Sequence, residues 1–64
     1  MRALNLRETE AKVGFKKTLI YRLLAAGQFP QPIKIGRASR WLESELDAFL
    51  LERANEREQG KGRA

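Results

Sequence analysis

The side chains best suited to chemistry in this chain of 64 residues are its cations. Seven of them fall between Glu10 and Glu43, a stretch without any acid: Lys12, Lys16, Lys17, Arg22, Lys34, Arg37 and Arg40. Lysine offers a point charge and arginine a planar fork of donors, and both bind phosphate oxygens. Residues 1–42 carry nine basic and two acidic side chains, whereas residues 43–64 carry four and six. This one-sided charge favours a polyanionic partner such as nucleic acid; a solvated basic surface is the alternative.

Enzymatic chemistry is not expected from this composition. The chain has no cysteine and no histidine. It therefore has no thiol nucleophile, and it lacks the commonest general base and the commonest ligands of zinc. Ser39 and Ser44 have no ordinary base to activate them, and no glycine-rich phosphate loop is present. We therefore expect a binding protein without metal, cofactor or small-molecule substrate. No apolar run is long enough for a membrane span or a signal peptide, which favours a cytoplasmic, nucleoid-associated location.

A first short helix is predicted near the N-terminus. Asn5 and Glu8 have the spacing of a capping box, in which each side chain accepts a hydrogen bond from the other residue's backbone N–H. The helix is expected to run from Leu6 to Val13 and to end at Gly14.

A second helix is predicted over residues 17–26. Its apolar stripe is formed by Ile20, Leu23 and Leu24. Lys16 and Lys17 lie at its N-terminus, where cations oppose the helix dipole. Their placement makes sense if phosphate groups neutralise them.

A small β-hairpin is predicted after the second helix. Two prolines in residues 28–32 stop the helix, and residues 33–35 and 39–41 then have the pattern of two short strands. We expect Ile33 and Ile35 to face inward against Trp41. The side chains expected to project outward are Lys34, Arg37 and Arg40.

A last helix is predicted to begin at Ser44 as its N-cap. Its inward stripe comprises Leu46, Phe49 and Leu50, and we assign Phe29 and Trp41 to the core as well. From residue 56 the composition turns polar and contains glycine. The sequence thus predicts one domain over residues 1–55 and a flexible polar tail over residues 56–64.

These elements predict a mainly α fold with a small β-hairpin, which is a winged helix-turn-helix of three helices and a two-stranded wing. The second helix would enter the major groove of DNA and the wing would lie against the backbone. The residues expected to contact DNA are Lys16, Lys17, Thr18, Tyr21, Arg22, Lys34, Arg37 and Arg40. For four of these a structural role is the alternative: a half-buried ring for Tyr21, a solvated charge for Arg22 and Lys34, and cover over the Trp41 ring for Arg40.

The stretch from Asn5 to Leu50 resembles the AlpA-type phage regulators and the related small excisionases, which share a winged helix-turn-helix similar to that of MerR activators. The matching segments are residues 6–8, 13–15, 19–23, 27–36 and 41–46. The most distinctive is Phe29-Pro30-Gln31-Pro32-Ile33-Lys34-Ile35-Gly36, followed by Trp41 and a helix.

The resemblance implies sequence-specific binding to double-stranded DNA beside a prophage or genomic-island attachment site. Such proteins regulate transcription of an integrase gene, or bend DNA and direct the recombinase toward excision. The resemblance places recognition on the second helix and the wing contacts on Arg37 to Arg40, which adds Ser39 to the expected site. An integrase and further copies of the chain on adjacent sites are candidate partners. Some small relatives instead bind and inhibit a response regulator, so a protein target is the alternative.

Two residues depart from the family pattern. Lys16 stands where the family usually has a serine, so the second helix lacks its side-chain cap. Glu10 lies four residues before the turn glycine, where helix-turn-helix units prefer a small residue.

Overall fold

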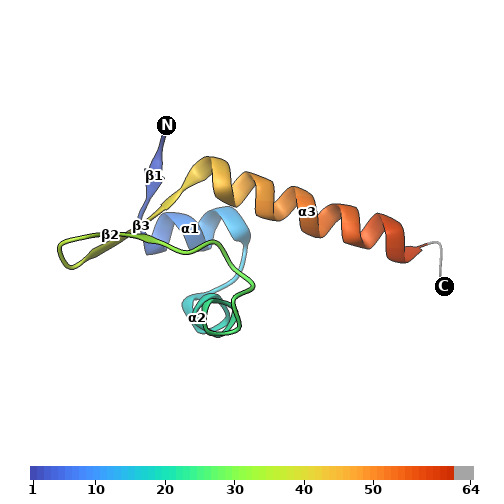
Figure 1. Ribbon diagram of the computed structural model, residues 1–64, viewed down its shortest axis with the longest axis horizontal. Helices are drawn as coiled ribbons and strands as arrows, with labels where there is room; N and C mark the ends of the chain where they lie inside the picture. Colours follow the sequence, from blue (N-terminus) through green and yellow to red (C-terminus); the bar gives the residue numbers. More distant parts are fainter. Residues whose placement is uncertain (62–64) are drawn as a thin grey trace.

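The fold is a winged helix-turn-helix, as the sequence predicts. The computed structural model describes residues 1–61, with side chains through residue 57. In chain order the elements are β1 (Ala3–Leu4), α1 (Leu6–Val13), α2 (Lys17–Ala25), β2 (Ile33–Ile35), β3 (Ala38–Leu42) and α3 (Glu43–Lys61). Figure 1 shows the β2–β3 hairpin extending from one side of the helical body and α3 extending from the other.

The predicted start and end of α1 are both confirmed. The Glu8 backbone N–H donates to Asn5 Oδ1 at 2.8 Å, and the Asn5 N–H donates to Glu8 Oε1 at 2.9 Å. At the other end Gly14 adopts the left-handed conformation with φ of 86°, and its N–H donates to the Glu10 carbonyl at 2.8 Å. The left-handed conformation costs glycine little energy, because glycine has no Cβ to clash with the backbone.

The sheet has three antiparallel strands in the order β1-β3-β2. Strand β1 is absent from the sequence prediction, and it pairs Leu4 with Trp41. Because directly paired residues share a face, both of these side chains point into the core, where they are 2% and 1% exposed.

The expectation that the two isoleucines of β2 face inward is wrong. Ile33 pairs with Arg40 and Ile35 pairs with Ala38, so all four side chains lie on the face opposite to Trp41. The isoleucine side chains are accordingly 43% and 63% exposed. The position of Trp41 on the partner strand decides which face of β2 is buried.

The core is formed by side chains from both helical and sheet elements. Its buried members are Leu4, Ile20, Phe29, Trp41 and Leu46, which confirms the core assignment of both aromatic residues. Phe29 packs edge-on against Trp41, with ring centroids 6.5 Å apart, and against Phe49 at 5.0 Å. The Trp41 Nε1–H donates to the Pro30 carbonyl at 3.0 Å, so the one polar atom of the ring is satisfied.

Helix α3 follows β3 without a loop. It begins at Glu43, whose N–H donates to the Arg2 carbonyl at 2.8 Å. Ser44 therefore lies inside the first turn, and its prediction as the N-cap is wrong because the helix begins two residues earlier than that cap implies. The helix continues to Lys61, beyond residue 56 where the tail was expected to begin. The end of that predicted tail, residues 62–64, falls outside the described residues.

Ion pairs link α1 to α3 and link both helices to Arg2, the residue before β1. Lys12 Nζ lies 2.6 Å from Asp47 Oδ1 and 3.6 Å from Glu43 Oε2. Arg2 pairs with Glu8 at 3.1 Å and with Glu43 at 3.8 Å. Lys12 is therefore engaged on the α3 side of the molecule, so it does not add to the basic surface that the sequence predicts.

The first prediction concerns Thr9, a core residue of α1. Its side chain is fully buried, and its hydroxyl has no hydrogen-bond partner within the described part of the chain. Because a buried unpaired hydroxyl is costly, Thr9→Val should raise the free energy of unfolding by about 1 kcal/mol. Urea denaturation checks this result, with Thr18→Val on the exposed face of α2 as the control. A loss of stability in Thr9→Val would show that the hydroxyl is bonded in solution.

The second prediction concerns the pH dependence of the ion pairs. The hydrogen bond to Asp47 is the main cause that raises the pKa of Lys12 above its ordinary 10.5, assisted by the charges of Asp47 and Glu43 and opposed by desolvation. The protonated amine is thus favoured by folding, so its contribution is complete below pH 10.5 and is lost as pH rises through the raised pKa. The difference in unfolding free energy between the protein and Lys12→Met should be constant from pH 8 to about 10 and shrink above it. A difference that grows with pH in denaturant titrations would contradict this assignment.

Candidate nucleic-acid interface

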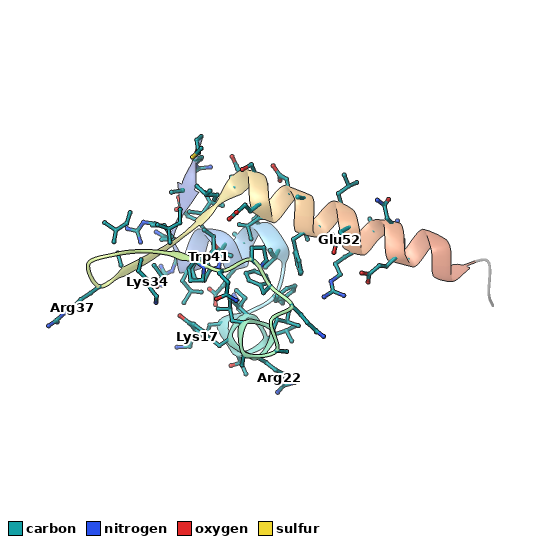
Figure 2. All side chains as sticks on the ribbon, viewed as in Figure 1. Lys17, Arg22, Lys34, Arg37, Trp41 and Glu52 are labelled. Atoms are coloured by element: carbon teal, nitrogen blue, oxygen red, sulfur yellow. The ribbon has the colours of Figure 1, made fainter. Side chains whose placement is uncertain are left out.

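Helix α2 separates a buried side from an exposed polar side. Ile20 is fully buried, while Thr18, Tyr21 and Arg22 are exposed on the helix. Residues three and four apart share a face of a helix, so these three side chains form one surface. Tyr21 is 50% exposed, so about half of its surface is open to a ligand. Figure 2 shows Arg22 pointing away from the body of the molecule.

The wing presents a second polar surface on the same side as α2. Lys34 pairs with Ser39 across the hairpin, and Lys34 Nζ donates to Ser39 Oγ at 2.7 Å. Both lie on the sheet face that carries Trp41, which is the face that the helices cover. In Figure 2, Arg37 extends from the tip of the wing, and Arg37, Lys17 and Arg22 all lie on the side of the molecule away from α3.

The structure does not bring Arg40 together with the other wing residues, which corrects the expected outward set of Lys34, Arg37 and Arg40. Arg40 pairs with Ile33, so strand alternation places it on the opposite face of the hairpin from Lys34. It is partly buried, and its Nη1 donates to the Ser39 carbonyl at 3.0 Å. The expected DNA contact of Arg40 is thus separated from the surface formed by α2 and Lys34.

Most of the expected site cations carry uncompensated charge. In the part of the chain described, the ion pairs that hold the fold do not involve the following residues: Lys16, Lys17, Arg22, Lys34 and Arg37. All five side chains are exposed. We call this set the basic surface.

Acidic side chains gather along α3. A groove between the α2–β2 connection and α3 is lined by Glu45, Glu52 and Glu56, over a floor that includes Phe49. Arg53 covers that ring at 5.3 Å and pairs with Glu56 at 3.2 Å. Among the described residues, the exposed cations without an ion pair are thus the basic surface and Arg7 of α1, whereas these acids lie along α3.

The start of α2 has an unusual arrangement. Lys16 is the N-cap residue, and it makes no side-chain capping bond, as the sequence predicts. The Lys17 backbone N–H instead donates to Glu10 Oε2 at 2.8 Å, so a carboxylate from α1 caps α2. This contact is not predicted from the sequence, because it joins residues seven apart across the turn. Arg7 is also missed, and it lines the same surface depressions as Glu10 and Lys16.

Two other kinds of site receive no support in the described residues. Among the side chains described, those of residues 1–57, no three acidic, histidine or cysteine residues gather in a way that would hold a metal ion. None of the described helices combines the length and the apolarity that crossing a bilayer requires.

Comparison with known proteins identifies one family. The family described as "Prophage CP4-57 regulatory protein (AlpA)" matches residues 2–54, which include every element from β1 to β3, more than half of α3 and the whole basic surface. No curated protein and no solved structure matches the chain significantly. Since the matched segment covers most of the chain, this protein belongs to the AlpA family of prophage regulatory proteins.

Proposed function

We propose that this protein binds double-stranded DNA in a sequence-specific manner and regulates a prophage or genomic island. Its output would be transcription of an integrase gene, the direction of recombination as an excisionase, or both. The observation that supports this proposal best is the basic surface, in which the exposed face of α2 and the inner face of the wing carry unpaired cations on one side of the molecule.

The dimensions of α2 suit the major groove. An α-helix with its side chains is about 10–12 Å across, and the major groove of B-DNA is about 12 Å wide, so α2 fits within it. Arg22 would donate to guanine N7 and O6, and Thr18 would reach a base edge or a phosphate. At the C-terminal end of α2, the small exposed residues Ala25 and Ala26 would let the helix approach the DNA closely.

The wing and the start of α2 would contact the backbone. Lys34 and Ser39 lie together on the wing, and Arg37 lies at its tip, so these residues would position the protein without reading sequence. Lys16, Lys17 and Tyr21 would reach phosphate or sugar from the other side. A module this small buries a limited area on DNA, so we propose that several copies bind repeated sites, alone or beside an integrase.

The third prediction concerns salt. If the five residues of the basic surface each neutralise one phosphate, the logarithm of affinity should fall with the logarithm of salt concentration with a slope of about −4 to −5. Fluorescence anisotropy on a duplex selected by this protein from a random pool measures the slope. Binding that is independent of salt would contradict the proposal. Failure to protect any duplex in a footprint, with retained binding to an acidic protein, would favour the inhibitor alternative.

The fourth prediction separates base reading from backbone contact. Arg22→Ala should cost about 1–3 kcal/mol on the selected duplex and much less on a scrambled one, because only the former offers the right base edge. Arg37→Ala removes the same charge and serves as the matched control, and it should weaken both duplexes equally. Equal losses on the two duplexes for Arg22→Ala would remove base reading from that side chain.

A further inference from the structure

Glu10 of α1 accepts a hydrogen bond at each end of the turn that joins α1 to α2. The backbone carbonyl of Glu10 accepts the Gly14 N–H at 2.8 Å and so closes the end of α1. Its carboxylate accepts the Lys17 N–H at 2.8 Å and so caps the first turn of α2. The N-cap residue Lys16 has no oxygen in its side chain that could make this bond itself.

The carboxylate lies in a strongly cationic setting. Glu10 lines one surface depression with Arg7 and Lys16 and an adjoining one with Lys17 and Thr18. It is the last acid before Glu43 in the sequence. Within the described structure its carboxylate forms no ion pair shorter than 4 Å, so it is held by the backbone amide rather than by one of these cations.

An anion at this position does what a DNA phosphate would do. The first amides of a helix lack intrahelical partners and carry partial positive charge, so they attract phosphate as readily as carboxylate. The Glu10 carboxylate accepts a hydrogen bond from one of these amides, that of Lys17, and so places a negative charge beside Lys16 and Lys17. A backbone phosphate that approaches the start of α2 closely is therefore repelled by a fixed charge and finds the Lys17 amide already occupied.

We propose that Glu10 is a specificity-determining residue, whose carboxylate positions α2 for base reading and penalises binding that relies on the DNA backbone alone. This inference rests on the proposed function of α2 as the reading helix. At the target sequence, base contacts of Arg22 and its neighbours hold α2 in the groove, whereas binding without base contacts depends on phosphates at the start of α2. The penalty therefore falls mainly on non-specific binding, so the ratio of specific to non-specific affinity rises.

Two variants separate the two roles of the carboxylate. Glu10→Gln keeps an oxygen that can accept the Lys17 N–H but removes the charge, whereas Glu10→Ala removes both. Glu52→Gln is the matched control, because it makes the same change of net charge at an exposed position on α3. Affinities are measured for the selected duplex and for a scrambled duplex at the same salt concentration.

We expect Glu10→Gln to raise affinity for the scrambled duplex about threefold, which is the effect of one charge about 7 Å from a phosphate in water, while changing the selected duplex less. Glu52→Gln should leave the ratio of the two affinities unchanged. Glu10→Ala should weaken the selected duplex about fivefold, as expected for loss of a helix cap. Adding Lys16→Ser to Glu10→Ala restores a side-chain cap and should recover part of that loss.

Amide hydrogen exchange in the absence of DNA gives an independent reading of the cap. Protection at the Lys17 amide should persist in Glu10→Gln, fall in Glu10→Ala and return in the double variant. An unchanged affinity ratio in Glu10→Gln, with normal binding by the parent protein, would overturn the role of Glu10 and leave the proposed function intact. Failure of the parent protein to bind any duplex would overturn both.

Discussion

The burial of Trp41 fixes the geometry on which the candidate interface depends. Its ring is 1% exposed, packs against Phe29 and donates to the Pro30 carbonyl, so β3 is fastened to the segment that joins α2 to the wing. That segment is the covalent connection from α2 to the hairpin. The tryptophan therefore sets how the wing leaves the body, and with it the side on which Lys34 and Ser39 lie relative to α2.

The basic surface arises from the placement of acids rather than from the net charge of +5. Three carboxylates, Glu8, Glu43 and Asp47, neutralise Arg2 and Lys12 where β1, α1 and α3 meet. These exposed or half-exposed pairs add little stability individually, as is usual at a protein surface. Their consequence is electrostatic, because they neutralise Arg2 and Lys12 and leave the basic surface, with Arg7 of α1 beside it, as exposed cations without an ion pair in the described structure.

The features that the sequence could predict are local or strongly apolar. The Asn5–Glu8 capping box needs only residues three apart, and the core positions of Trp41 and Phe29 follow from their size. The features it missed depend on distant partners. Strand β1 is two residues long and exists only because it pairs with β3, almost forty residues later. The inward face of β2 could not be chosen from alternation alone, since alternation allows either face until a partner strand is known.

The same reason explains the outcome for the candidate site. Exposure of Thr18, Tyr21 and Arg22 follows from the apolar stripe of a single helix, and it agrees with the expectation. The separation of Arg40 from Lys34 depends on the hairpin register, and the capture of Lys12 by Asp47 depends on how α3 packs. The roles proposed for these residues in binding DNA remain predictions, whereas their positions are structural facts.

Helix α1 connects the ion pairs of α3 to the basic surface at the start of α2. Two residues apart on the same helix, Lys12 is bound to α3 and Glu10 is bound to the start of α2. In a helix-turn-helix that is capped by its own N-cap side chain, the first turn of the reading helix is a local structure. Here the cap belongs to the neighbouring helix, so the order of that first turn depends on α1 keeping its place against α3. A substitution on α3 that loosens the packing of α1 would therefore weaken the hydrogen bond from the Lys17 amide to Glu10. The first turn of α2, which carries part of the basic surface, would then lose its cap.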